Sequence, residues 1–286
     1  MKILLTGATG FIGGRLVDEL AARHELIALG RSRPEGVADW IEHDLASPLQ
    51  PSALPGRIDA VVHLAQSRRY REFPDGAGDM FAINVQSTFS LLEYARSAGA
   101  HCFVFASTGG MYAHSYERLV ETAPVKPIDF YLSSKYAAEL VAANYQQVFR
   151  TIVLRFFFVY GPGQRGMLVP RLLERVRAGE PVVVEGERGV RINPIYVTDA
   201  VRVFEPALSL ERSDVFNVAG DEIVSIEELV AAMGSVTGRQ PIVEHGPRSL
   251  DGDLVGDNAR MKDVLGVVPQ VTLEEGLAAT FAELAP

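Results

Sequence analysis

The chain has 286 residues, of which 48% are hydrophobic and 22% charged, and its formal net charge is −9. This length accommodates a large domain with or without a smaller one, and the acidic balance argues against nucleic-acid or anionic-membrane partners, which require a surplus of Lys and Arg. The single cysteine, Cys102, excludes an internal disulfide, and no signal-peptide pattern or membrane-length apolar run occurs, so we expect a reduced, cytoplasmic setting without a membrane partner.

The N-terminal stretch predicts a strand, a tight turn and a helix. The apolar run Ile3–Leu5 indicates a buried parallel strand, glycines follow at three-residue spacing (Gly7, Gly10, Gly13), and an apolar-periodic helix begins at Phe11. A diphosphate can bind at a helix N-terminus only where backbone N–H groups point at it and no side chain blocks the approach, which favours glycine. We therefore expect an anion site here.

The second strand is predicted at residues 25–30 and is followed by Arg31-Ser32-Arg33, with no acidic residue. In dinucleotide-binding folds an acid at this position binds the ribose hydroxyls, whereas Arg suits a 2′-phosphate. We interpret Arg31 and Ser32 as favouring NADP over NAD, the alternative being an arginine pair that is merely solvated.

Further strands are predicted at residues 40–44, 60–65, 102–106 and 151–156, and a helix at 82–97. This alternation of strands and helices predicts an α/β protein with a parallel, doubly wound sheet. His63 lies in the apolar strand 60–65, so we interpret it as a hydrogen-bonded core residue rather than a ligand. The six histidines have no metal-ligand spacing, and we expect no metal.

A third signal is the pair Tyr131 and Lys135 at the start of a helix predicted over residues 131–149. Residues four apart lie on one helix face, so a phenol and an ammonium are presented together. The hydroxyls of Ser107 and Thr108 come directly after the strand 102–106, where they face a site at the carboxyl edge of the sheet.

Together these signals resemble the extended branch of the short-chain dehydrogenase/reductase superfamily, which includes nucleotide-sugar epimerases, dehydratases and ketoreductases. The resemblance covers nearly the whole chain, and further matching segments are Asp44–Leu45, Leu64–Ala65, Asn84–Val85, Val159–Pro162, Asn193–Asp199, Phe216–Gly220 and Ser225–Leu229. It implies a doubly wound parallel Rossmann sheet with a smaller C-terminal α/β substrate domain. Residues 1–160 would bind NAD(P) and residues 161–286 mainly substrate, with part of them, about 192–220, returning to the sheet. A homodimer formed through the helices 82–97 and 131–149 is also implied.

The resemblance implies that Thr108, Tyr131 and Lys135 are catalytic. Tyr131 would be base in oxidation and acid in reduction, Lys135 would hold the nicotinamide ribose, and Thr108, with Ser107 as the competing candidate, would bind the reacting oxygen. An adjacent ammonium and the positive charge of an oxidised nicotinamide favour phenolate, so we expect Lys135 to lower the pKa of Tyr131. The implied cofactor-binding residues are Gly7, Thr9, Gly10, Phe11, Ile12, Gly13, Arg31, Ser32, Asp44, Leu45, Leu64, Ala65, Tyr131, Lys135 and Phe156.

Departures from the family pattern narrow the reaction. Dehydratases of this branch have an Asp-Glu pair after the catalytic Thr, where this chain has Gly109-Gly110. Members that epimerise beside a ketone have a Cys where this chain has Gly110. We therefore expect redox chemistry at one carbon, meaning 4-epimerisation or 4-keto reduction.

On the substrate side, Phe158 and Met167 stand where many members have amide donors to a diphosphate. Arg191, one register off the usual Arg, and Arg248 could replace those donors, or both are solvated. The candidate substrate-binding residues are Thr108, Phe158, Met167, Arg191, Asn193 and Arg248. We expect an NAD(P)-dependent nucleotide-sugar 4-epimerase or 4-ketoreductase. One alternative is an NADPH-dependent reductase of a non-nucleotide carbonyl. The other is a non-catalytic dinucleotide-binding protein, against which the intact Thr108, Tyr131 and Lys135 argue.

Overall fold

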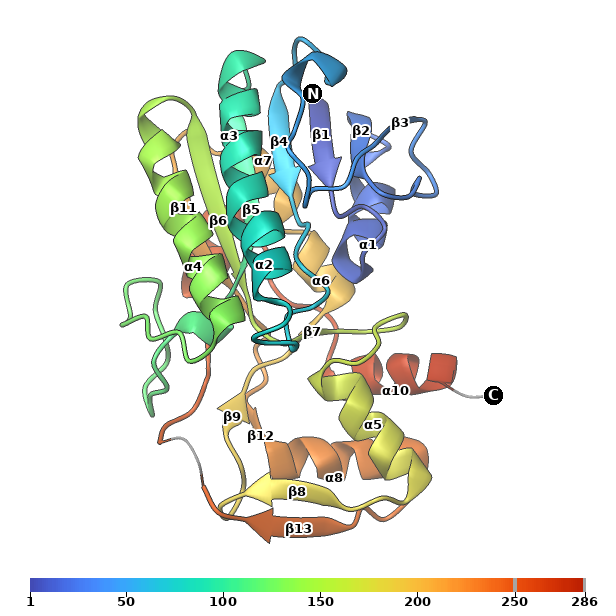
Figure 1. Ribbon diagram of the computed structural model, residues 1–286. Helices are drawn as coiled ribbons and strands as arrows, with labels where there is room; N and C mark the ends of the chain where they lie inside the picture. Colours follow the sequence, from blue (N-terminus) through green and yellow to red (C-terminus); the bar gives the residue numbers. More distant parts are fainter. Residues whose placement is uncertain (249–250, 285–286) are drawn as a thin grey trace. The chain divides into compact units, whose positions relative to one another are not determined.

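The computed structural model describes residues 1–248 and 251–284 (Figure 1). The chain divides into two compact units, each assembled from separate stretches of sequence. The first unit comprises Met1–Met111, Val125–Arg155 and Val201–Phe216. The second comprises Tyr112–Pro124, Phe156–Ala200 and Asn217–Pro286.

The first unit is built on a seven-stranded sheet with the strand order β11-β6-β5-β4-β1-β2-β3. Its strands are β1 (Lys2–Thr6), β2 (Glu25–Gly30), β3 (Asp39–Glu42), β4 (Ala60–His63), β5 (Cys102–Thr108), β6 (Arg150–Phe156) and β11 (Asp214–Val218). The pairs β1–β2, β1–β4, β2–β3 and β4–β5 are parallel. The order of strands reverses between β1 and β4, which is the place where sheets of this kind bind ligands.

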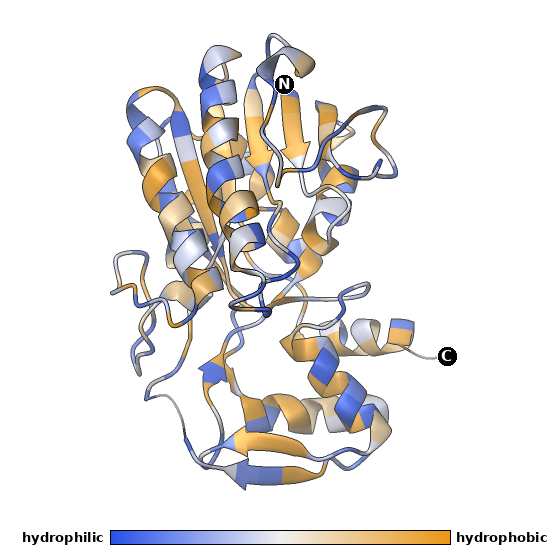
Figure 2. Cartoon of the chain, viewed as in Figure 1, coloured by the Kyte–Doolittle hydropathy of each residue, from blue (hydrophilic) through white to orange (hydrophobic). Residues whose placement is uncertain are grey.

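Helices cover the sheet because its central strands are apolar and buried along their length, and β1 and β4 are orange in Figure 2. The helices and helical turns of this unit are α1 (Phe11–Leu20), η1 (Pro51–Ala53), α2 (Ala77–Met80), η2 (Phe81–Gln86), α3 (Ser87–Ser97), η3 (Gly109–Met111), α4 (Phe130–Ala143), η4 (Asn144–Gln147) and α7 (Phe204–Ser209). Helix α3 packs on β4, α4 packs on β5 and on α3, and α7 also contacts β5. The doubly wound α/β fold predicted from the sequence is confirmed.

His63 is fully buried and lies between two threonines, which confirms it as a core residue. Its Nδ1 is 2.7 Å from Thr6 Oγ1, and its Nε2 is 3.0 Å from Thr88 Oγ1. Thr88 donates to the carbonyl of Asn84, so its oxygen accepts the Nε2 proton of His63, while Nδ1 accepts from Thr6. Burial lowers the pKa of His63 to about 3, and the ring is a neutral clamp between β1, β4 and α3.

The second unit has its own hydrophobic core, which lies between two strands and three helices. Strands β8 (Val182–Glu185) and β13 (Val243–Gly246) pair in parallel, and helices α5 (Leu168–Ala178), α8 (Ile226–Thr237) and α10 (Leu273–Leu284) pack on one another. Helix α8 begins with a capping box, in which Ser225 and Glu228 exchange hydrogen bonds. The remaining elements are β7 (Val159–Tyr160), β9 (Arg191–Ile192), β10 (Ile195–Tyr196), α6 (Val197–Val201), β12 (Val224–Ser225) and α9 (Ala259–Leu265).

Cys102 is buried on β5, as predicted, and burial raises the pKa of its thiol to about 11. Among the residues that the structure describes, no helix has both the length and the apolar character required to span a bilayer.

Candidate active site

The carboxyl ends of β1, β4 and β5 and the start of α4 lie together. The turn after β1 touches the segment after β4, since a Cβ at Gly7 would lie 2.8 Å from the backbone nitrogen of Ala65. The segment after β4 reaches α4, because the Tyr131 hydroxyl donates to Gln66 Oε1 at 2.7 Å. Helix α4 in turn contacts β5 through Lys135, whose ammonium donates to the Ala106 carbonyl at 2.6 Å. The glycine turn and the Tyr/Lys pair, far apart in the sequence, therefore belong to one site.

The glycine turn has no space for a side chain at Gly7 or Gly13. Gly7 has φ +74°, and the Gly10 N–H donates to the Gly7 carbonyl at 2.9 Å. Helix α1 begins after Gly10 with no side-chain cap and no acidic residue in its first turn. Its first N–H groups thus remain available to an anion, which is the arrangement that a dinucleotide diphosphate requires.

Two adjacent glycines of α1 provide a matched test of this turn. A Cβ at Gly13 would lie 2.0 Å from the Gly7 carbonyl oxygen, whereas at Gly14 the nearest atom is 3.9 Å away. We expect Gly13→Ala to destabilise the protein by about 1–3 kcal/mol and to weaken NAD(P) binding. Gly14→Ala should stabilise it by about 0.5–1 kcal/mol and leave binding unchanged. Thermal unfolding measures the stability of the two variants, and cofactor titration measures their NAD(P) affinity. Equal cofactor affinities would contradict the assignment of this turn as the diphosphate site.

Tyr131 and Lys135 lie one turn apart on α4, which is capped by the Asp129 carboxylate accepting from Leu132 N–H at 2.7 Å. Lys135 is only 1% exposed, and its ammonium lies 4.1 Å from the centroid of the Phe105 ring. Tyr131 is half-buried, and its ring lies 5.5 Å from that of Tyr70.

The pKa values in the site differ from the sequence expectation that Lys135 lowers the pKa of Tyr131. Burial is the main cause that raises the pKa of Tyr131 above its ordinary value, and the neighbouring Tyr70 and Asp129 raise it further. Burial also lowers the pKa of Lys135 to about 7, although the Glu139 carboxylate opposes this. In this state the phenol keeps its proton and acts as a hydrogen-bond donor to Gln66, because desolvation disfavours the charged form.

The lowered pKa of Lys135 predicts a pH-dependent stability. Between about 7 and the ordinary lysine value of about 10.4, the unfolded chain binds the proton that the folded chain releases, so stability rises with pH in this window. We expect Lys135→Met to lack this rise, which amounts to about 1.4 kcal/mol per unit of pKa difference. Urea unfolding at both ends of the window measures it, and parallel pH profiles for the two proteins would contradict the shift.

Thr108 ends β5, and its Oγ1 accepts a hydrogen bond from the Gly110 N–H at 3.1 Å. This bond leaves the hydroxyl proton of Thr108 available to a substrate oxygen. The competing candidate, Ser107, is buried, and its Oγ has no hydrogen-bond partner. Both hydroxyls therefore lie at the end of β5, and Thr108 is the more exposed of the two.

The remaining candidate cofactor residues lie at neighbouring strand ends. Leu45 is buried and lines a small hollow of about 10 Å³, together with His43, Ser47, Pro48, Leu49, Gln86, Ser87 and Ser90. Asp44 is exposed and accepts from Ala46 N–H at 3.1 Å. Arg31 is exposed just after β2, and Phe156 is buried at the end of β6. His43 was missed by the sequence analysis, and its Nε2 is buried without a hydrogen-bond partner.

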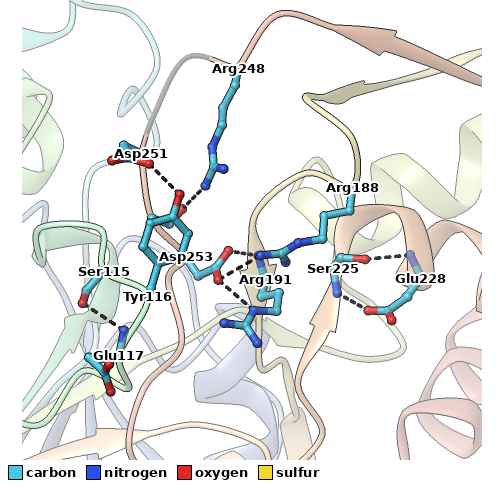
Figure 3. A network of polar contacts seen from close by, with 11 residues as sticks. Ser115, Tyr116, Glu117, Arg188, Arg191, Ser225, Glu228, Arg248, Asp251 and Asp253 are labelled. Atoms are coloured by element: carbon cyan, nitrogen blue, oxygen red, sulfur yellow. Dashed lines mark hydrogen bonds and ion pairs between the residues drawn. The ribbon is translucent and has the colours of Figure 1, made fainter.

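In the second unit, the two candidate diphosphate arginines lie in one cluster of charged residues (Figure 3). Arg191 Nε donates to the Asp253 carboxylate at 2.7 Å, and Arg188 Nη2 approaches the same oxygen at 3.3 Å. Arg248 lies 5.4 Å from the centroid of the Tyr116 ring. Burial alone would raise the pKa of Asp253, but hydrogen bonds from Arg191 and Arg188 outweigh it and hold the pKa below its ordinary value. Arg188 was not predicted, and it brings a third guanidinium to this cluster.

Asn193 requires a correction. Its side-chain amide donates to the carbonyls of Gly220 and Gly256 at 3.0 and 2.8 Å, and its oxygen accepts from Gly256 N–H at 2.9 Å. The residue is 2% exposed, so its polar atoms are used to join backbone segments of the second unit. Asn193 therefore holds the backbone of the second unit together, and its amide is not free to contact a substrate.

Phe158 is the described non-glycine residue with a positive φ, at +46°. An asparagine adopts this left-handed conformation more readily, because its short polar side chain can bond to the local backbone. Phe158 instead packs against the core of the second unit. Met167 is 38% exposed at the N-terminus of α5. Phe158 and Met167 therefore place apolar side chains at the two positions where many related proteins have amide donors to a diphosphate.

Comparison with known proteins shows the family of the chain. Residues 3–219 match the model of the NAD dependent epimerase/dehydratase family. The chain belongs to this family. The extended short-chain dehydrogenase/reductase resemblance is thereby confirmed, together with the enzyme class that it implies.

Relatives within the family catalyse different reactions. UDP-glucose 4-epimerase of Mycolicibacterium smegmatis is 30% identical, covering 98% of this chain and 97% of the relative. The dTDP-4-dehydro-6-deoxy-D-allose reductase of Streptomyces bikiniensis is also 30% identical, covering 97% and 94%. Among solved structures, MoeE5 in complex with UDP-glucose and NAD has a TM-score of 0.86 and 30% identity, covering 99% of this chain and 98% of that one. The chain is therefore similar to epimerases and reductases that act on nucleotide sugars.

Proposed function

We propose that this protein is an NAD(P)-dependent nucleotide-sugar oxidoreductase, a 4-epimerase or 4-ketoreductase that uses Tyr131 as its acid and base. The single observation that supports this most is the convergence of Tyr131 and Lys135 with the glycine turn after β1, through Ala65 and Gln66. A protein that only bound a dinucleotide would not need a phenol at the end of this cradle.

The residues present fit a dinucleotide. The cradle at Gly7 and Gly13 excludes side chains, and the first turn of α1 presents N–H groups to a diphosphate. When bound, a nicotinamide supplies the hydride acceptor and donor for the reaction.

The chain's own residues then handle the proton and the oxygen. Tyr131 passes its hydroxyl proton to a carbonyl oxygen in reduction and takes the proton of a sugar hydroxyl in oxidation. Thr108 donates to the same oxygen and holds it near the phenol. The Lys135 ammonium lies on the same helix face and stabilises the phenolate that forms when Tyr131 gives up its proton.

The arginine cluster of the second unit supports a phosphorylated substrate. Arg188, Arg191 and Arg248 present planar guanidinium groups, which bind phosphate oxygens bidentately. Asp253 fixes the orientation of Arg191 and Arg188 while leaving each side chain about two-fifths exposed (40% and 41%). We propose that this cluster holds the diphosphate of the nucleotide sugar in place of the missing amide donors.

The experiment that tests the function begins with the small molecules released on denaturing freshly purified protein, identified by mass spectrometry. The purified protein is then incubated with UDP-glucose and with NAD or NADP, following both the 4-epimer and the nicotinamide absorbance. Retained cofactor with epimer formation supports the epimerase, and stoichiometric NADPH consumption with a 4-keto sugar supports the reductase. Absence of cofactor binding would contradict the proposal.

We further propose that NADP is accepted at least as well as NAD. Arg31 is exposed at the carboxyl end of β2, where an acid would repel a 2′-phosphate, and MoeE5 by comparison contains NAD. Titration of both cofactors against the protein and its Arg31→Glu variant tests this, since the variant should reverse the preference.

A homodimer is proposed through η2–α3 and α4. These elements present exposed large apolar side chains at Phe81, Phe89 and Leu140, which are 50–54% exposed. Sedimentation equilibrium tests this, and a mass equal to the 31.1 kDa monomer would contradict it.

A second candidate function is the reduction of a smaller, less polar carbonyl compound. The left-handed Phe158 and the apolar Met167 favour it, because strain at a residue that keeps its apolar side chain suggests a need for that side chain. Turnover of non-nucleotide carbonyls without turnover of nucleotide sugars would favour this function.

A further inference from the structure

The loop after β4 contains the sequence Arg68-Arg69-Tyr70-Arg71, which no motif of the sequence analysis included. This loop contacts the phenol of Tyr131 at two points. Gln66 Oε1 accepts the Tyr131 hydroxyl at 2.7 Å, and the Tyr70 ring lies 5.5 Å from the Tyr131 ring with an interplanar angle of 52°. The loop therefore lies beside the oxygen that exchanges a proton in the proposed reaction.

Tyr70 also connects Tyr131 to a cation. The guanidinium carbon of Arg71 lies 5.1 Å from the centroid of the Tyr70 ring, in the range of a cation–π contact. Tyr131, Tyr70 and Arg71 thus form a continuous series of two ring contacts. The series places a guanidinium one aromatic ring away from the catalytic phenol.

Two acidic groups of this segment, Glu72 and Asp79, have other partners. Glu72 accepts from Arg69 Nε at 2.6 Å, and Asp79 accepts the hydroxyl of Ser67. The guanidinium of Arg71 faces an aromatic ring instead of a carboxylate, in a chain whose net charge is −9. A cation in this position favours an anionic group on the ligand, because guanidinium groups bind carboxylates through two parallel hydrogen bonds.

The chemistry of a hexopyranose identifies where that anion would be. If C4 carries the reacting oxygen at Tyr131, then C5 is its ring neighbour, and C6 is the substituent that extends from C5. We propose that Arg71 binds a carboxylate at C6 and that the substrate is a nucleotide-linked uronic acid rather than a neutral hexose. This inference rests on the proposed function, since it requires the sugar to react at Tyr131.

The test compares kcat/KM for UDP-glucuronate and UDP-glucose, followed by epimer formation and by nicotinamide absorbance. The wild-type protein should prefer the uronate at least tenfold. Arg71→Gln should reduce this preference ratio by about 10–100-fold, and Arg71→Lys should restore part of it, because the charge remains while the fork geometry is lost. Arg68→Gln, an exposed arginine of the same loop, is the matched control and should leave the ratio unchanged.

Other outcomes would overturn the inference. A wild-type preference for UDP-glucose, or an unaltered ratio in Arg71→Gln, would show that Arg71 does not recognise a carboxylate. An equal loss in Arg68→Gln would indicate a general effect of loop charge instead. In each of these cases the protein still turns over UDP-glucose, so only the inference about Arg71 is overturned. If the wild-type protein processes neither UDP-glucose nor UDP-glucuronate, the proposed function is contradicted as well. Thermal unfolding of each variant checks that the loop changes leave the fold in place.

Discussion

Replacing Tyr131 with phenylalanine is expected to reduce kcat by about 10²–10⁴-fold, the usual contribution of a positioned acid or base. The change removes one oxygen atom and with it the hydrogen bond to Gln66, while the ring contact with Tyr70 at 5.5 Å remains possible for phenylalanine. Because the glycine turn is untouched, NAD(P) affinity should change by no more than a few-fold. The loss is measured by steady-state kinetics beside a cofactor titration.

Tyr136→Phe is the matched control for this substitution. Tyr136 lies on α4, next to Lys135, and is half-buried like Tyr131, but it faces a different side of the helix. It should retain wild-type turnover. Unchanged turnover in Tyr131→Phe would contradict the catalytic role and favour the non-catalytic dinucleotide-binding alternative.

Much of the fold could be predicted because its signals are local. Strand β2 (Glu25–Gly30) has the predicted bounds, since an apolar run marks it. The helix predicted over residues 82–97 instead begins as the π-helical turn η2. There, buried Asn84 donates to Ser134 Oγ at 2.9 Å and accepts from Ser67 N–H at 2.9 Å. These partners are distant in the sequence, so periodicity could not reveal the turn.

The candidate site residues come from motifs in the sequence. Gly7, Gly13, Tyr131 and Lys135 stand out because their spacing reflects a backbone or helix requirement, and they remain predictions as functional residues. Gln66, Tyr70 and His43 were missed, since nothing in their own neighbourhood distinguishes them and only the folded sheet brings Gln66 and Tyr70 to Tyr131. The effect of burial on the pKa of Tyr131 could not be predicted for a related reason, because desolvation depends on the whole surrounding structure.

Replacing Glu139 with methionine is expected to destabilise the protein by about 3–5 kcal/mol, because it leaves a buried guanidinium without its counter-ion. Arg155 Nε and Nη2 donate to the Glu139 carboxylate, the shortest contact being 2.6 Å, and the two side chains are 7% and 6% exposed. This pair joins α4 to β6, one turn beyond Lys135. The double variant Glu139→Met with Arg155→Met should recover most of the stability, since a buried ion pair and an apolar pair of similar volume are often of comparable stability. Urea unfolding of the three proteins measures both changes, and a double variant as unstable as the single one would show that packing, not charge, is the cause.

The same double variant separates the structural role of Glu139 from its electrostatic effect on Lys135. The Glu139 carboxylate raises the pKa of Lys135 against the effect of burial, so its removal should lower that pKa below about 7. Glu139 lies on the same helix as this lysine, one turn further along, while His63 on the neighbouring β4 is neutral at such pH values, since its pKa is about 3. If the Lys135 ammonium supports Tyr131, the fall of kcat with rising pH should then begin at a lower pH in the double variant than in the wild type. A pH–rate profile measures the shift, and an unshifted profile in a variant of recovered stability would show that Glu139 serves Arg155 alone.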